Sequence, residues 1–294
     1  MTIRDERQGR RRAAWMILAA GLAAGVVGAA VGPGGVEWGF VSSPSLIEAV
    51  PPLPPTSVYP VQLVLDDDGS EGSFGVLGGQ GARQFLWFNH FTPPGGFSLE
   101  EVWVLYPLDP NVTVGAAVQI AVYEDPDGNP ANGAVLRTSF NSTVQAADGN
   151  TFSIYPLPAP VLIPGGSDVL IGVVPRFIVS GVTPPTQPAA LDTTASQQRS
   201  WLAIWTGDPP DPPVLTPAPD QFYGLVDAFL PGNWMIRGFG TAPPVLEIPT
   251  LSGWGLAAVA ALLALGGALA LRRRSLRPEA AGSRAGRGGG RQPW

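Results

Sequence analysis

An uncharged apolar run near the C-terminus constrains this chain more than any other feature. Residues 253–271 carry no charge, and at a rise of about 1.5 Å each they would form a helix of about 28 Å. That length is close to the roughly 30 Å of a bilayer's hydrocarbon core. We therefore predict a single transmembrane helix over 253–271. The alternatives are a buried core helix and a plain single-pass anchor that is never processed.

The run ends in a cluster of three arginines, Arg272, Arg273 and Arg274. Basic residues beside a membrane span stay on the cytoplasmic side, so this cluster predicts the topology. We expect the Arg-rich tail, residues 272–294, to lie inside the cell and the upstream part of the chain to lie outside.

A short motif precedes the run, in a predicted linker over residues 242–252. Pro249 fixes its own φ and biases Ile248 toward extended backbone, which is the form of peptide that proteases grip. Ser252 is a candidate N-cap, and Trp254 lies where interfacial aromatic residues are common. A helix cap with an aromatic belt would explain these residues without any processing enzyme.

The motif, the apolar run and the arginines together resemble the IPTL-CTERM protein-sorting domain of bacterial exported proteins. The matching positions are Ile248, Pro249, Thr250, Leu251, Ser252, Trp254, Gly255 and Leu256. That family is similar to the PEP-CTERM and LPXTG systems, in which a membrane-embedded or membrane-anchored transpeptidase of the sortase or exosortase kind cuts near the motif. The resemblance implies that this chain is a substrate of such an enzyme and not an enzyme itself.

The N-terminus has the layout of a secretory signal peptide over residues 1–31. Arginines come first, an apolar stretch covers 13–31, and small residues precede a Gly-Pro break. An uncleaved anchor is the alternative. A signal peptide implies the secretion machinery as a partner, and the Pro-rich residues 32–58 that follow are predicted to be a linker.

The charge is distributed unevenly along the chain. Residues 32–247 contain 20 acidic residues and five Arg, a formal charge of −15. Such a region is poorly suited to nucleic acid or anionic lipid and well suited to staying soluble outside the cell. We therefore expect the cell envelope, with the inner membrane as an intermediate and the cell surface or medium as the destination. The chain has no Cys, so its core must hold the fold without disulfides.

Residues 59–241 show short β-rich runs separated by Pro, Gly, Asn and Asp. We predict strands over 61–65, 83–91, 99–106, 117–123, 134–140, 151–156, 169–174, 201–206 and 234–240. Alternation in 101–106 and 120–123 is sufficient to place one face inward. The pattern predicts an all-β fold, an antiparallel β-sandwich of the jelly-roll type.

Two acidic turns raise the question of a metal ion. The candidate ligands are Asp66, Asp68, Asp125, Asp127 and Asn129. The last three have the Asp-x-Asp-x-Asn spacing of calcium loops, but Pro130 and Leu136 occupy positions where an EF-hand needs Gly and Glu. Turn formation explains both clusters without an ion. Calcium is therefore the alternative, and no other cofactor is expected.

The residues do not predict an enzyme. His90 has neither a Cys nor a Gly-x-Ser-x-Gly elbow to act with, so an exported hydrolase has no complete catalytic set. We predict a non-enzymatic, exported envelope or cell-surface protein. The alternative is a carbohydrate- or calcium-binding adhesion module, in which aromatic residues such as Trp103, Trp201, Trp205 and Trp234 would stack on sugars instead of filling the core.

Overall fold

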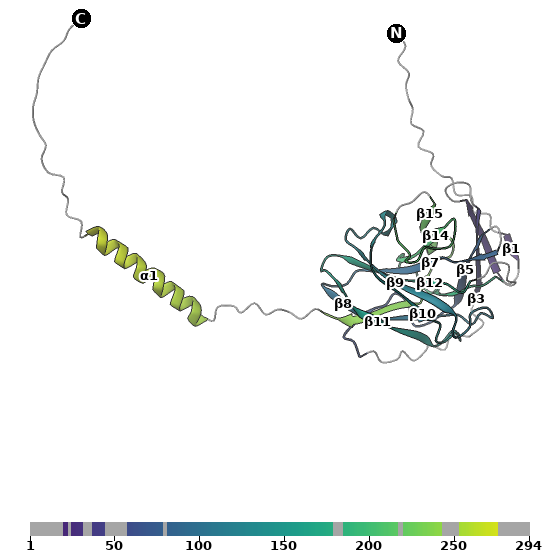
Figure 1. Cartoon of the computed structure of the whole chain (residues 1–294), viewed down its shortest axis with the longest axis horizontal. Coiled ribbons are helices and arrows are strands. Elements are labelled where there is room, and N and C mark those ends of the chain that lie inside the picture. Colours follow the sequence, from purple (N-terminus) through teal and green to yellow (C-terminus); the bar gives the residue numbers. More distant parts are fainter. Residues whose placement is uncertain are drawn as a thin grey trace, which may run out of the picture. The chain divides into compact units, whose positions relative to one another are not determined.

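The computed structural model describes residues 20–22, 25–31, 37–44, 58–78, 81–178, 185–216, 220–242 and 253–275. The chain divides into two compact units, Met1–Pro243 and Pro244–Trp294. The first contains the strands and the second the helix (Figure 1). Side chains are described from residue 39 onward in the first unit and over 256–272 in the second.

The strands of the first unit form three sheets, here called A, B and C, in which all pairs are antiparallel. Sheet A has the order β1 (Ala20–Leu22), β2 (Gly25–Val31), β3 (Glu37–Pro44), β5 (Gly72–Gly78), β13 (Ala189–Asp192), β16 (Asn233–Trp234), with β6 (Gly81–Arg83) also paired to β5. Sheet B has the order β11 (Phe152–Ile163), β8 (Phe97–Leu105), β17 (Ile236–Thr241), β4 (Val61–Leu63). Sheet C has the order β10 (Val135–Thr143), β9 (Ala117–Asp125), β12 (Asp168–Pro175), β7 (Leu86–Phe91), β14 (Ser200–Trp205), β15 (Gln221–Leu225). Two short 3-10 helices, η2 (Pro130–Asn132) and η3 (Val226–Ala228), lie in the connections.

Sheets A and B meet at a bend at Met235, between β16 and β17. The Met235 amide donates to the Ala190 carbonyl of sheet A at 3.2 Å, and its carbonyl accepts from the Leu105 amide of sheet B at 3.0 Å. The segment 233–241 therefore belongs to both sheets. Instead of the two sheets of a jelly roll, the hydrogen bonds define three, because this chain segment changes direction where the two sheets join.

The prediction of an antiparallel all-β fold is confirmed. All nine predicted runs overlap observed strands, but the run over 151–156 continues to Ile163 as β11, and the runs over 83–91 and 234–240 each span two strands. β5, β13 and β15 were not predicted. In β8 the prediction of one inward face is wrong. Val102 and Val104 join the large core cluster while Trp103 and Leu105 join a second cluster with Phe152 and Phe239, so both faces are covered.

The N-terminal region differs from the sequence prediction in part. Residues 37–44, inside the predicted linker, form β3 and pair with β5. Residues 20–22 and 25–31, inside the predicted signal peptide, form β1 and β2, and β2 pairs with β3. This pairing does not support a signal peptide over 1–31. The small and β-branched residues of β1 and β2 suit a strand as well as the apolar segment of a signal peptide.

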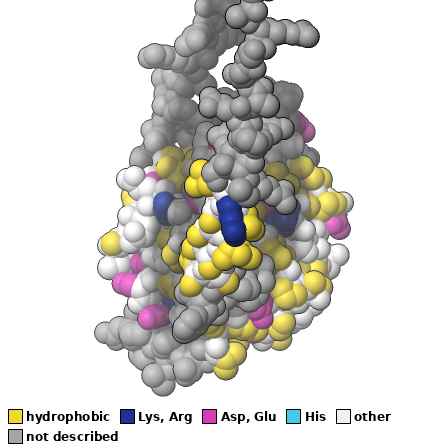
Figure 2. Space-filling view, turned by 90° about the vertical axis from the view of Figure 1, so that its left-hand side faces the viewer, with side chains coloured by type: hydrophobic (Ala, Val, Ile, Leu, Met, Phe, Trp, Pro, Cys, Tyr) yellow, Lys and Arg dark blue, Asp and Glu magenta, His cyan; other side chains and the backbone are white. Residues whose placement is uncertain are grey.

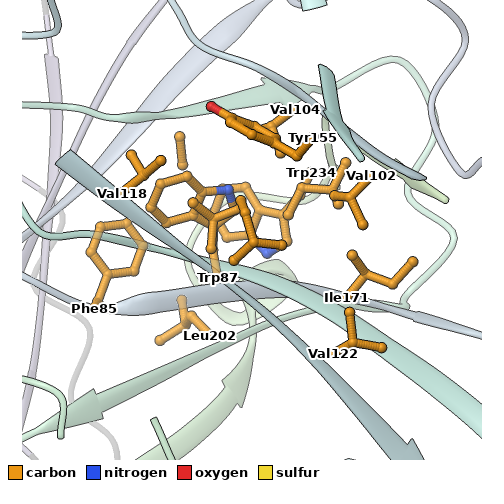
Figure 3. Close-up of a cluster of buried hydrophobic side chains, with 14 of the residues drawn as sticks. Phe85, Trp87, Val102, Val104, Val118, Val122, Tyr155, Ile171, Leu202 and Trp234 are labelled. Carbon is orange, nitrogen blue, oxygen red and sulfur yellow. The ribbon is translucent and has the colours of Figure 1, made fainter. Parts of the chain in front are cut away.

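The core is built around two fully buried indoles, Trp87 of β7 and Trp234 of β16 (Figure 3). Phe85 packs beside Trp87 with ring centroids 5.2 Å apart, and Phe74 packs edge-on to Trp234 at 5.4 Å. Each such side chain stabilises the fold by about 1.5–3 kcal/mol through burial alone. The Trp234 Nε1 also donates to the Trp201 carbonyl at 2.7 Å, so its polar atom is satisfied inside the core.

One buried amide connects sheet C to the bend between sheets A and B. The Asn89 Nδ2 on β7 donates to the carbonyl oxygens of Trp234 at 2.8 Å and Ile236 at 2.9 Å. Its Oδ1 accepts from the Ser200 hydroxyl at 2.7 Å, and that hydroxyl accepts from the Trp234 amide at 2.9 Å. Asn89 and Ser200 are both inaccessible to solvent. This network fixes the position of sheet C relative to the bend between sheets A and B.

The second unit corrects the prediction of a transmembrane helix over 253–271. A helix does form there, α1 (Gly253–Ser275). Within the part of the chain that the structure describes, however, no helix is both long enough and apolar enough to cross a membrane. Alanine and glycine occupy much of α1 and contribute less apolar surface than leucine or valine would.

We expect Asn89→Ala to destabilise the first unit by about 3 kcal/mol or more, because each buried group left without a partner costs about 1–3 kcal/mol. Urea unfolding measures the loss. Asn141→Ala is the matched control, since Asn141 is exposed on β10; it should cost less than about 0.5 kcal/mol. Equal losses for the two variants would contradict the role given to the Asn89 network.

Candidate functional site

The sorting-motif residues fall at the start of α1 and just before it. Trp254 and Gly255 belong to the first turn of the helix. Ile248, Pro249, Thr250, Leu251 and Ser252 lie outside the described residues, and so does the predicted N-cap. The observed helix therefore begins within the motif, at Gly253.

The helix itself has no polar face until its last turn. Its described side chains from Leu256 to Leu271 are apolar and exposed all round the axis, with none of the polar face of a helix packed on a globular domain. Arg272, Arg273 and Arg274 follow in the last turn, where cations interact favourably with the helix dipole. Their role in setting topology stays a prediction.

The first predicted metal pair, Asp66 and Asp68, binds a guanidinium. The Arg237 Nε lies 3.1 and 3.2 Å from the two Asp66 oxygens, and its Nη2 contacts Asp66 and lies 2.6 Å from Asp68 Oδ1. The Asp66 side chain is inaccessible to solvent and that of Arg237 is 3% exposed. Burial raises the pKa of Asp66, and the bonds to Arg237 oppose that rise. A positive charge already satisfies these carboxylates, so they form a structural ion pair.

The second predicted set lies in the turn after β9. Asp127 accepts from the Asn129 amide at 3.1 Å and from the Asn132 Nδ2 at 2.6 Å. The Asn129 Oδ1 accepts from the Ala131 amide at 3.3 Å, which caps η2. Gly128 has φ +69°, a conformation that favours glycine. The turn prediction is confirmed here, and Asn129 serves as a cap.

Asp125, the last residue of β9, differs from the residues of the turn that follows it. It is inaccessible to solvent, and neither carboxylate oxygen accepts a hydrogen bond of regular geometry. Burial raises the pKa of Asp125 to about 6, and the adjacent Asp127 carboxylate adds to the rise. The pKa of Asp127 is lowered, mainly by the amide of Asn132. Two neighbouring carboxylates therefore have very different environments.

The strands beside this turn carry further ionisable groups. Asp168 of β12 is the cross-strand partner of Asp125, and its Oδ2 lies 2.5 Å from the His90 Nε2 of β7. Burial lowers the pKa of His90, and the bond to Asp168 opposes this. Glu124 pairs with Arg137 at 3.4 Å. Sequence reasoning found Asp125 and His90 separately but not that one end of sheet C brings them together.

An open cavity of about 480 Å³ adjoins Asp125 and Asp127. Its remaining lining comes from the turn, from the start of β10 and from the loop before β15; the residues are Pro126, Asn132, Gly133, Ala134, Val135, Leu215 and Thr216. Carboxylate, amide and hydroxyl oxygens therefore occur on the residues around one hollow, a set that suits hard cations.

Another carboxylate cluster joins Asp67 and Glu71, two further oxygen donors of the first acidic turn, to Asp192, which the sequence analysis missed. Among the described residues, ligand atoms of Asp67, Glu71 and Asp192 lie within 4.8 Å of one another. The buried Asp192 accepts from the amides of Asp67 at 3.2 Å and Thr194 at 2.8 Å. Asp67 and Glu71 lie in one loop, so the sequence itself predicts that they are close together. Nothing in the sequence places Asp192 beside them. Backbone amides donate hydrogen bonds to the carboxylates of this cluster, whereas the Asp125 oxygens accept none of regular geometry.

The tryptophans proposed for sugar stacking are largely internal. Trp103, Trp205 and Trp234 are buried, and Trp201 is half-buried. The acidic side chains visible in Figure 2 are scattered and do not form one patch among the described residues. On the face shown in Figure 2, the described aromatic and acidic side chains therefore do not define a broad binding surface.

Comparison with known families identifies the C-terminal segment. The model of the IPTL-CTERM motif matches residues 248–274, which confirms the resemblance drawn from the sequence. This motif is a C-terminal sorting signal of exported, envelope-associated proteins, and it covers only that part of the chain. No curated protein matches the chain.

We expect Arg237→Met to destabilise the first unit by about 3–5 kcal/mol, because it leaves Asp66 charged and buried without a partner. Adding Asp66→Asn should recover part of the loss in urea unfolding. Arg137→Met is the control: its side chain is 40% exposed, so losing its pair with Glu124 should cost less than about 1 kcal/mol. A similar loss of unfolding free energy in Arg237→Met and Arg137→Met would show that the buried ion pair is no more important to stability than the exposed one.

A pH dependence follows from Asp125. Its pKa is about 6 in the fold against 3.8 in the reference state, so the folded chain holds a proton that the unfolded chain has lost between these values. Stability should therefore fall as pH rises from about 4 to about 6. Asn cannot titrate, so Asp125→Asn should gain stability relative to the natural chain over this window.

Urea unfolding across that range, in buffer with EDTA, tests this expectation. Asp148→Asn serves as a control of opposite sign: although burial raises the pKa of Asp148, the bonds from Asn150 and Thr151 outweigh it and lower the pKa. A stability difference between Asp125→Asn and the natural chain that stays constant with pH would show that Asp125 does not titrate in this way.

Proposed function

Because residues 248–274 carry an IPTL-CTERM motif, we propose that this chain is a non-enzymatic exported protein with a cleavable C-terminal sorting signal. An enzyme of the sortase or exosortase kind reads the motif, cuts near it, and delivers the β-sheet unit to the envelope or cell surface. The motif match is the observation that carries the proposal.

The division of the chain into two units supports removal of the signal. The three core clusters draw their described residues from between Phe40 and Phe239 and include none from α1. A cut near Thr250 would therefore take none of the described buried side chains away from the sheets. The described core would stay intact on release of the first unit.

The chemistry around the cut site supports the same reading. Pro249 favours extended backbone on its N-terminal side, and α1 begins four residues later, at Gly253. The peptide that leads into Pro249, with Ile248 at its end, is thus the stretch that an active site can bind in extended form. The apolar helix suits an enzyme that works in or at the membrane, and the arginines of its last turn suit a polar or anionic boundary.

The rest of the chain fits the role of exported cargo. Its acidic excess favours solubility outside the cell, and its fold needs no disulfide. The secretion machinery would be its first partner. The adhesion alternative gains no support from aromatic residues, since Trp103 and Trp234 lie in the core.

The test is the intact mass of the mature protein recovered from its native cell. We expect a C-terminus near Thr250, with or without an added group. Replacing Pro249 and Thr250 with Ala should block processing and retain α1, because the enzyme then lacks its recognition residues.

The matched control replaces Pro243 and Thr241 with Ala, the same residue types outside the motif, and should be processed normally. A mature chain that ends at Trp294 with the motif intact would overturn the proposal. Normal processing of the motif variant would show that the enzyme reads some other feature.

A further inference from the structure

The end of β9 holds a buried carboxylate, Asp125, for which no described side chain supplies a counter-charge. Asp125 is inaccessible to solvent, and its two oxygens lack hydrogen-bond partners among the residues that the structure describes. An ionised carboxylate in that state is costly, and natural proteins compensate it with a donor, a proton or a cation. The side-chain amide donor of this turn is used elsewhere, since Asn132 donates to Asp127.

The neighbouring carboxylates do have nitrogen-bearing side-chain partners. Glu124 pairs with Arg137 at 3.4 Å, and Asp168 lies 2.5 Å from His90. No described basic side chain pairs with Asp125 or Asp127. Among the described carboxylates at this end of sheet C, Asp125 and Asp127 are therefore the two that contact neither an arginine nor His90.

We propose that Asp125 and Asp127 form a binding site for Ca²⁺ that opens into the cavity beside them. Calcium takes six to eight oxygen ligands and accepts carboxylates, amides, hydroxyls and water together. The cavity has Asp125, Asp127, Asn132 and Thr216 in its lining and is large enough for several waters, each of which needs about 30 Å³.

The ligand set differs from the one that spacing alone suggests. Asn129 would be the third ligand of an Asp-x-Asp-x-Asn loop, but its oxygen caps η2 through the Ala131 amide. Asn132 instead faces Asp127 across the turn, and a rotation of its amide would present an oxygen in place of the nitrogen. Asp125 and Asp127 are the two ligands on which the site depends.

The shape of the site predicts modest affinity. Only two carboxylates are available and the cavity is open, so water must complete the coordination shell. Sites of this kind in extracellular modules bind Ca²⁺ with Kd of about 0.1–1 mM. Because Mg²⁺ demands a tighter octahedral shell and releases water reluctantly, it should bind more weakly.

Thermal unfolding of the full chain in mild detergent, after removal of metals with EDTA, tests the proposal. Ca²⁺ at about tenfold its Kd should raise Tm by about 3–6 °C. Asp125→Asn and Asp127→Asn should each abolish that rise. Asp127 is exposed, so its variant should fold even if the Asp125 variant does not.

Two controls decide what a response means. Asp148→Asn changes another turn carboxylate that binds backbone amides and should keep the full rise in Tm. Asp67→Asn changes the cluster with Glu71 and Asp192 and should also keep it. Loss of the rise in Asp67→Asn alone would assign the ion to that cluster and overturn the proposal. So would the absence of a rise, or an equal rise with Mg²⁺ that survives Asp127→Asn.

Discussion

The Asn89 amide is the interaction on which the arrangement of the sheets depends. Apolar packing between layers has no preferred direction, so Trp87 and Trp234 can hold the sheets together without fixing their relative position. Asn89 adds direction, because its hydrogen bonds reach the two carbonyls that flank the bend at Met235. That bend joins sheets A and B, and one side chain of sheet C therefore positions both. A fully satisfied polar group in a core specifies one packing among several of similar energy.

Much of the fold was predictable, and the misses have physical causes. The strand predicted over 117–123 is β9, because its alternating and β-branched residues report local preference directly. Residues 72–78 are rich in Gly and residues 189–192 contain two Ala, so neither stretch has a strand preference of its own. They form β5 and β13 because their neighbours pair with them. The helix over 253–271 was predictable as a helix but not as a membrane span.

The site shows the same division between local and distant information. Turn-forming residues predicted the turn that holds Asp127 and Asn129, since a turn depends on adjacent positions in the sequence. The partner of Asp66 is Arg237, 171 residues later, and no pattern in the sequence announces it. Burial is equally invisible: Asp125 and Asp127 look alike in the sequence, yet one is inaccessible and the other exposed.

The pairing of β4 with β17 has a consequence for the order of events during synthesis. Leu63 is in register with Gly238, so the first strand of residues 58–242 pairs with the last one. β7 likewise pairs with β14, which lies more than 100 residues later in the chain. Pairings between strands this distant in sequence make folding slow, because the chain loses the entropy of loop closure before the stabilising contacts form. A chain that emerges N-terminus first can therefore not complete sheet B until β17 has followed, so the sheets close only once nearly all of the first unit is available.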